Sequence, residues 1–280
     1  MWSIEFISEQ DFRTHVRNTI EEYKKALYAP MDLKTFNKNI IDPIKFTFDK
    51  FLYGLSWQDL INREIIRQKD KTINNSIGYF HQKIFQFIHR PGCRIVVPKN
   101  GELAFPEKGG LAGWDIAFEN EDRIEIDQTT SVSRIYVEMK NKHNTMNSTS
   151  SRRTYDKMEK QILKDDDCAC FLVEAIASES QNTKWIQKEG NNKKIRRVSI
   201  DVFYGIVTND SLGFFKICKE LPNMIQSVAK SEMYSSEKDK NNQVYRELIK
   251  SIGKARDCID DYQLTMALYT LGFGTYKGFC

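Results

Sequence analysis

Apolar residues recur at helical spacing in the first part of the chain. One face of a helix over residues 8–27 would carry Phe12, Val16, Ile20 and Tyr23. Ser8 precedes this stripe and is a candidate N-cap. Pro43 marks the start of a further helix, because proline is well tolerated in the first helical turn. Residues 1–70 are therefore predicted to form a helical N-terminal subregion.

The middle of the chain combines one more helical stripe with several strand-like segments. The stripe consists of Ile77, Phe80, Ile84, Phe87 and Ile88. Pro91 and Gly92 end it, because proline does not continue a helix. Strands are predicted at 93–98, from about 114 onward, at 134–141, at 168–177 and at 198–208, and a helix at 151–164. Residues 122–129 either extend the strand that begins near 114 or pair with it.

This order of elements predicts the fold class. A helix, three strands, a helix and a strand in succession are typical of an α/β domain with a mixed β-sheet flanked by helices. Extra N- and C-terminal helices would complete it, with residues 209–280 mainly helical. Two polar stretches, 178–197 and 231–242, are predicted to be flexible.

Composition narrows the function only slightly. The 280 residues are 40% hydrophobic, which allows a sizeable core, and the net charge of +4 neither requires nor excludes nucleic acid. The six cysteines lack CxxC spacing, and the start of the chain lacks signal-peptide features. We therefore expect reduced thiols and a cytoplasmic location. No apolar run approaches the ~20 residues that a membrane span needs, so no membrane partner is expected.

The stretch IYVEMKNKHNT, residues 135–145, contains the strongest chemical signal. Side chains two apart on a strand point the same way, so Glu138 and Lys140 would share one face of the sheet. An exposed acid–amine pair would contribute little stability. A second acid, Asp115, lies at the start of the preceding predicted strand, directly after a glycine-rich loop (residues 109–113). Two carboxylates on adjacent strands would suit Mg²⁺, and a lysine beside the metal would assist hydrolysis of a phosphodiester.

Asp115, Glu138 and Lys140, together with the predicted order of helices and strands, resemble the PD-(D/E)XK nuclease superfamily. The resemblance covers roughly residues 75–177. The segment YVEMKNKHNTMNSTSS and the following TYDKMEKQI resemble a group of type II restriction endonucleases that cut GGNCC-like sites. The resemblance implies that Asp115 and Glu138 are metal ligands, with the Met139 carbonyl as a third, and that Lys140 is the catalytic lysine. The chain departs from the motif at Trp114, where the family has proline.

The resemblance also leaves alternatives and accessory positions. Asp127 is a rival for the role of Asp115. Gln161 and Gln82 match positions where relatives place a glutamine or an acid, although packing or capping would explain both equally well. The polar run after the catalytic lysine is expected to contact DNA through Asn141, Lys142, His143, Asn144, Arg152 and Arg153. Its alternative role is to cap the next helix, with Thr149 or Ser150 as the cap.

The resemblance implies a Mg²⁺-dependent type II restriction endonuclease. It would hydrolyse both strands of double-stranded DNA at a short palindromic, GGNCC-like site and leave 5′-phosphate ends. The chain would be one endonuclease domain, 1–280, with its catalytic core at 75–208. A homodimer is expected, and a cognate DNA methyltransferase would act on the same site without needing to bind. The alternatives are a repair or recombination nuclease of this fold, or a non-catalytic DNA-binding protein.

Overall fold

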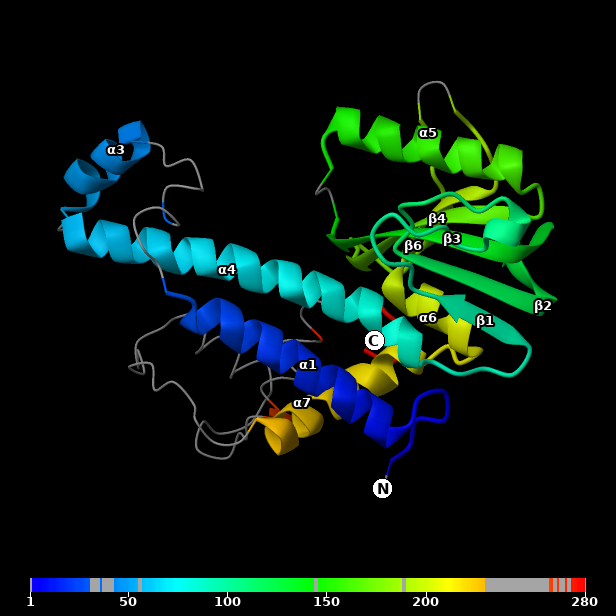
Figure 1. Cartoon of the computed structure of the whole chain (residues 1–280), viewed down its shortest axis with the longest axis horizontal. Coiled ribbons are helices and arrows are strands. Elements are labelled where there is room, and N and C mark those ends of the chain that lie inside the picture. The colour runs from blue at the N-terminus through cyan, green and yellow to red at the C-terminus, as the bar shows by residue number, and fades with distance from the viewer. Residues whose placement is uncertain are drawn as a thin grey trace. The chain divides into compact units, whose positions relative to one another are not determined.

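A mixed sheet of six strands, in the order β1-β2-β3-β4-β6-β5, forms the middle of the chain in the computed structural model (Figure 1). β1, β2 and β3 are antiparallel, β4 is parallel to both β3 and β6, and β5 is antiparallel to β6. The strands are β1 (Cys93–Val96), β2 (Ile116–Asp127), β3 (Thr130–Lys142), β4 (Cys168–Ile176), β5 (Asn182–Lys184) and β6 (Ile195–Ser199). The structure describes residues 2–30, 36, 43–54, 57–143, 146–187, 190–229, 262–263, 266, 270 and 273–279.

The chain divides into two compact units, residues 1–16 with 81–280 and residues 17–80. The helices are α1 (Glu9–Tyr28), α3 (Pro43–Tyr53), α4 (Trp57–Lys83), α5 (Ser148–Lys164), α6 (Ile200–Thr208) and α7 (Gly213–Val228), with short 3-10 helices η1 (Ile84–Phe87) and η2 (Pro106–Lys108). Within the smaller unit, Lys69 Nζ donates to the Leu27 carbonyl at 2.7 Å and joins α4 to α1. None of the described helices combines the length and hydropathy that crossing a membrane requires.

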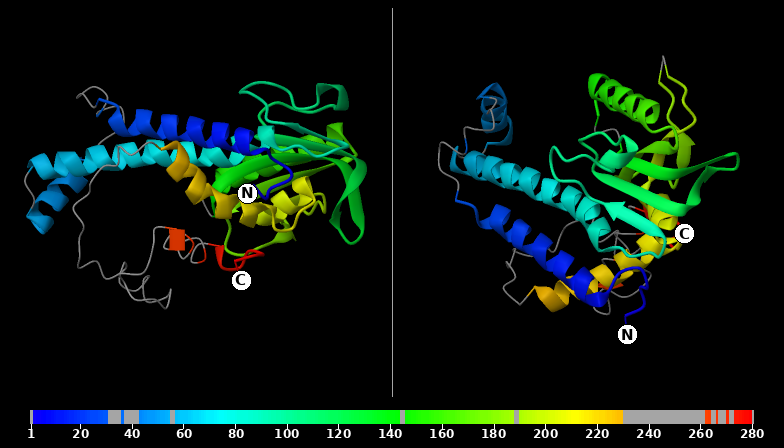
Figure 2. Two further views of the ribbon diagram at one scale, coloured as in Figure 1. Left: turned by 90° about the horizontal axis from the view of Figure 1, so that it is seen from below. Right: turned by 45° about the vertical axis from the view of Figure 1, so that its right-hand side comes forward.

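Helices cover both faces of the sheet. α5 lies over one face and α6 over the other (Figures 1 and 2). On the α5 face, Tyr155 and Met158 pack into a buried cluster with Tyr136 of β3 and Cys170 and Leu172 of β4. Because β4 is central and covered on both sides, its residues from 168 to 175 are all buried. The prediction of a mixed sheet with flanking helices is confirmed.

The prediction of one strand over residues 198–208 is wrong. β6 ends at Ser199, and residues 200–208 form α6. A continuous apolar run has no clear period, so strand and helix cannot be distinguished from it alone. The local signals favour a helix, since Ser199 occupies the N-cap position and Asp201 lies in the first turn. The change of element turns the chain at the end of the sheet and brings α6 back across the face opposite α5.

The prediction of flexibility over residues 178–197 is also wrong in part. This stretch contains β5 and most of β6, and Trp185 is buried. Arg196 forms an ion pair with Asp127 at 3.0 Å and donates to the Asn182 side chain at 2.5 Å. Polar composition misled the prediction because these charged residues have partners within the sheet. Residues 188–189 and the stretch 231–242 lie outside the described residues.

Candidate active site

Asp115 lies where the glycine-rich loop enters β2. Its N–H donates to the Val137 carbonyl at 2.9 Å, and its Oδ2 accepts from the Met139 N–H at 2.7 Å. Because Ile116 pairs with Val137, the antiparallel register places Asp115 opposite Glu138. Two consecutive backbone contacts on β3 thus fix the carboxylate beside the strand that carries the other acid and the lysine.

Glu138 is held between two ammonium groups. Its Oε1 accepts from Lys140 Nζ at 2.6 Å, and its Oε2 accepts from Lys157 Nζ at 2.5 Å. Lys140 follows two residues later on β3 and shares the α5 face, as the period of a strand requires. Lys157 comes from α5, and the Glu138 side chain is only 16% exposed. Sequence and fold together bring Asp115, Glu138 and Lys140 to one place.

The two carboxylates have opposite pKa shifts. Burial raises the pKa of Asp115 to about 6, and the nearby Glu138 charge adds to this effect. Burial also acts to raise the pKa of Glu138, but Lys157 and Lys140 outweigh it and hold that pKa below its ordinary value. Glu138 is therefore a stable anion, whereas the protonation of Asp115 depends on the charge placed next to it.

Lys157 is a site residue that the sequence analysis missed. Besides Glu138, its Nζ donates to the Gly113 carbonyl at 2.9 Å and lies 4.1 Å from the centre of the Trp114 ring. A lysine on a polar helix usually points into solvent, so the position of Lys157 in the sequence does not by itself predict a role in the site. The available signal was its spacing, one helical turn before Gln161 on the helix that follows the catalytic strand.

Gln161 fastens the glycine-rich loop to α5. Its side chain is fully buried, and its Oε1 accepts from the Leu111 N–H at 2.8 Å and from Trp114 Nε1 at 3.0 Å. Its Nε2 donates to the Gly109 carbonyl at 3.3 Å. The loop requires glycine at Gly110, where an added Cβ would lie 1.4 Å from the Ala104 carbonyl oxygen. Gln161 thus supports the backbone that leads into Asp115.

Asp127 and Gln82 lie apart from this group. Asp127 is at the far end of β2, in the turn to β3, where its Oδ1 accepts from the Thr129 N–H at 2.9 Å. Its Oδ2 pairs with Arg196. Gln82 is half-buried near the end of α4, and among the described residues no hydrogen bond links it to Asp115. The structure therefore brings neither of them to the carboxylate pair.

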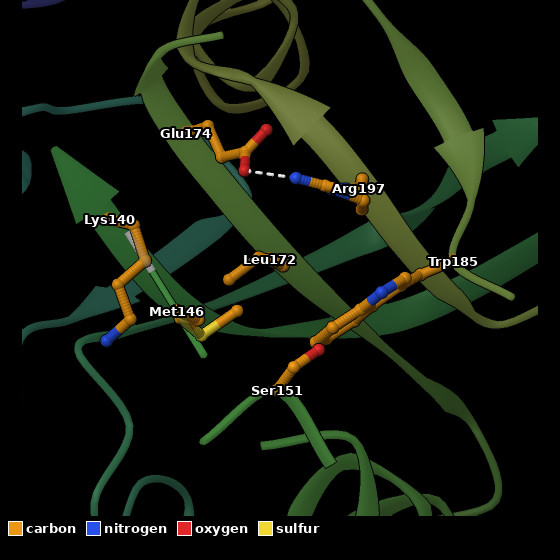
Figure 3. Close-up of a pocket in the computed structure, with 7 residues that line it drawn as sticks. All are labelled: Lys140, Met146, Ser151, Leu172, Glu174, Trp185 and Arg197. Atoms are coloured by element: carbon orange, nitrogen blue, oxygen red, sulfur yellow. Dashed lines mark hydrogen bonds and ion pairs between the residues drawn. The ribbon is translucent and has the colours of Figure 1, made fainter. Parts of the chain in front are cut away.

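A pocket next to Lys140 contains a second charged group (Figure 3). Glu174 is 2% exposed and accepts from Arg197 Nη2 at 2.5 Å, and its other oxygen lies 3.1 Å from His143 Nδ1. Lys140 and Arg197 lie on either side of Leu172 in this view. The lining residues are Lys140, Met146, Ser151, Leu172, Glu174, Trp185 and Arg197. Glu174 was missed, although a lone acid in the apolar run CACFLVEAIA was a signal.

The structure describes five of the six residues that were predicted to contact DNA. Lys142 is exposed, Asn141 is half-buried, and Arg152 and Arg153 are exposed in the first turns of α5. His143 is partly buried and directed at Glu174, and Asn144 lies outside the described residues. The prediction that Thr149 or Ser150 caps α5 is wrong. The N-cap is Asn147, whose Oδ1 accepts from the Ser150 N–H at 2.8 Å.

The donor atoms in this site suit a hard cation. Asp115 and Glu138 offer carboxylate oxygens on neighbouring strands, and such ligands match Mg²⁺ in the company of water and phosphate oxygens. The described residues contain no group of three or more His, Cys, Asp or Glu side chains that could hold a metal by themselves. Among the described residues, the pair Asp115 and Glu138 is therefore short of a complete set of side-chain ligands, as is common for Mg²⁺.

Comparisons with known proteins agree with the resemblance. The model of a family described as Eco47II restriction endonuclease matches residues 4–230. The type II restriction enzyme Sau96I of Staphylococcus aureus is 29% identical over 231 residues, which cover 78% of each chain. The type II restriction enzyme Eco47II of Escherichia coli is 26% identical over 238 residues, covering 80% of this chain and 87% of that one.

These matches define the class of protein as restriction endonucleases. The chain belongs to the Eco47II restriction endonuclease family, and it is a type II restriction enzyme, a site-specific deoxyribonuclease. The function inferred from the resemblance is confirmed at this level. The roles of individual residues stay predictions, to which the geometry above gives support.

Proposed function

We propose that this enzyme is a Mg²⁺-dependent nuclease with a PD-(D/E)XK core, whose active site consists of Asp115, Glu138 and Lys140. Asp115 and Glu138 would hold the metal, with the Met139 carbonyl as a third ligand. The observation that supports this most is the position of Asp115 opposite Glu138, with Lys140 bonded to Glu138 at 2.6 Å. Two acids and two lysines thus converge where the loop enters β2.

The side chains divide the work of hydrolysis. When bound, Mg²⁺ supplies positive charge to the phosphate and lowers the pKa of a coordinated water. Lys140 keeps an ammonium group beside Glu138, where it orients the attacking water and stabilises the charge that develops on the phosphate. Gln161 and Lys157 hold the glycine-rich loop in place, and this loop leads the chain into Asp115.

The DNA substrate would lie along the polar residues that follow Lys140. Lys142, Arg152 and Arg153 are exposed cations suited to phosphates, and an arginine can also read a base edge. From the resemblance, we propose a GGNCC-like palindromic site, with cleavage of both strands and 5′-phosphate ends. A cognate DNA methyltransferase would protect the same site in the cytoplasm.

A homodimer would match a palindromic site, because two equal half-sites call for two active sites related by a twofold axis. Apolar side chains on α3 support an interface in the smaller unit: Phe48, Phe51, Leu52 and Tyr53 are 62–79% exposed. Sedimentation of the Phe51→Asp variant tests this assignment. A lower association state than that of the wild type is expected, and an unchanged state would exclude α3 as the interface.

Digestion of a plasmid of known sequence tests the proposed activity. With Mg²⁺, discrete fragments that share one end sequence are expected, and the fragment ends give the site and the cut position. Cleavage only at branched junctions would instead indicate a repair nuclease. Glu138→Ala should lower cleavage roughly 10²-fold or more while duplex binding persists. Glu125→Ala, which removes an exposed acid from β2, is the matched control and should cleave normally.

A further inference from the structure

We propose that Lys157 is a positioning residue that couples binding of the divalent cation to binding of DNA. In the DNA-free enzyme its ammonium group neutralises Glu138 and weakens the attraction of the site for a cation. This inference rests on the proposed function, since it assumes that Glu138 is a metal ligand.

The position of Lys157 is fixed from three sides. Its Nζ contacts Glu138 Oε2, the Gly113 carbonyl and the face of the Trp114 ring. A carboxylate, a carbonyl dipole and an aromatic face all favour a positive charge. The side chain is 26% exposed, so solvent screens these contacts only partly. These three contacts restrict the ammonium group to one position, whereas the ammonium group of a fully exposed lysine is mobile.

The charges of the site balance without DNA. Asp115 and Glu138 can contribute two negative charges, and Lys140 and Lys157 contribute two positive ones. Both oxygens of Glu138 accept from an ammonium group, one from each lysine. A divalent cation that approaches Glu138 therefore meets a neutral site whose carboxylate is already occupied. A DNA phosphate adds negative charge at this point and shifts the balance in favour of the cation.

The arrangement separates the roles of the two lysines. Lys140 lines the pocket of Figure 3, where a phosphate can reach it, whereas Lys157 does not line this pocket and lies against the Gly113 carbonyl and the Trp114 ring. Lys157 thus acts through Glu138 rather than on the substrate. A unit charge and a divalent cation that share one carboxylate repel each other enough to change affinity roughly tenfold, even at the dielectric constant of water.

Calcium titration of the full-length protein tests this proposal, with Ca²⁺ as a hard-oxygen probe. By isothermal titration calorimetry, Lys157→Met should bind Ca²⁺ roughly tenfold more tightly than the wild type without DNA. A cognate duplex should increase the Ca²⁺ affinity of Lys157→Met less than it increases that of the wild type. The difference between these two increases measures the coupling. Because coupling is reciprocal, the increase in duplex affinity caused by Ca²⁺ should shrink by the same factor, and Lys157→Arg should restore weak Ca²⁺ binding. Lys160→Met, which removes an exposed lysine from the same helix, should match the wild type.

Unchanged or weaker Ca²⁺ binding in a folded Lys157→Met variant would overturn the proposal, because a purely structural lysine gives that result. Lys157→Gln, which keeps a hydrogen-bond donor without the charge, serves if the methionine variant does not fold, and the same tighter binding is expected. Glu138→Ala separates this outcome from failure of the proposed site. If Ca²⁺ binding survives in Glu138→Ala, the metal assignment itself is wrong.

Discussion

Replacing Gln161 with methionine should destabilise the protein by about 2–3 kcal/mol. The methionine side chain is similar in length but cannot form the contacts to Leu111, Trp114 and Gly109. Each net hydrogen bond contributes ~1 kcal/mol, and the buried Trp114 Nε1 would be left without its partner. Because Trp114 precedes Asp115, cleavage should also fall, although Gln161 touches no reacting atom.

Urea unfolding measures this effect. The midpoint should decrease while the dependence of the unfolding free energy on urea stays the same, which is the signature of a change in stability. Gln86→Met, at an exposed position, is the control and should shift the free energy of unfolding by less than about 0.5 kcal/mol. If Gln161→Met unfolds at the wild-type midpoint, the hydrogen bonds of Gln161 do not stabilise the glycine-rich loop.

Three further substitutions test separate parts of the account. Lys140→Met should lower single-turnover cleavage strongly without weakening Ca²⁺ binding, because an ammonium group is not a ligand; a defect confined to Ca²⁺ affinity would contradict its role. Arg197→Met leaves Glu174 buried without that ion pair and should cost about 2–3 kcal/mol by urea unfolding, a value discounted for the partial exposure of Arg197. Burial, with a contribution from His15, lowers the pKa of His81 to about 4. The unfolded chain therefore binds more protons at His81 than the folded chain does. The contribution of His81 to the free energy of unfolding should be fully present above about pH 6.5 and should be lost as the pH falls toward 4. His81→Asn should flatten this fall in thermal melts, and an unchanged pH dependence would refute it.

The strand period made the centre of the site predictable from sequence. Glu138 and Lys140 are two residues apart on a strand, so their shared face follows from geometry alone, and Asp115 follows from the glycine-rich loop that precedes it. The N-terminal helices also follow from their patterns, with Ser8 capping α1 through the Asp11 N–H at 3.0 Å. In these places the local pattern and the tertiary fold demand the same residues.

Contacts between distant elements were not predictable. Lys157 reaches Glu138 only because α5 packs across β3, and Glu174 meets Arg197 only because β4 and β6 are neighbours. Nothing in a single sequence specifies these pairings. The prediction of a strand over residues 198–208 failed for a different reason. An apolar run is compatible with a buried strand or a buried helix, and only the capping residues distinguish the two.

The cation-binding role of Asp115 is the most direct test of the account. Calorimetry should compare Ca²⁺ binding by Asp115→Ala, Asp127→Ala and the wild type, each with a cognate duplex. We predict that Asp115→Ala loses Ca²⁺ binding and cleavage, whereas Asp127→Ala keeps both, because Asp127 lies in the distant β2–β3 turn. Wild-type Ca²⁺ affinity in Asp115→Ala, or its loss in a folded Asp127→Ala, would contradict the account.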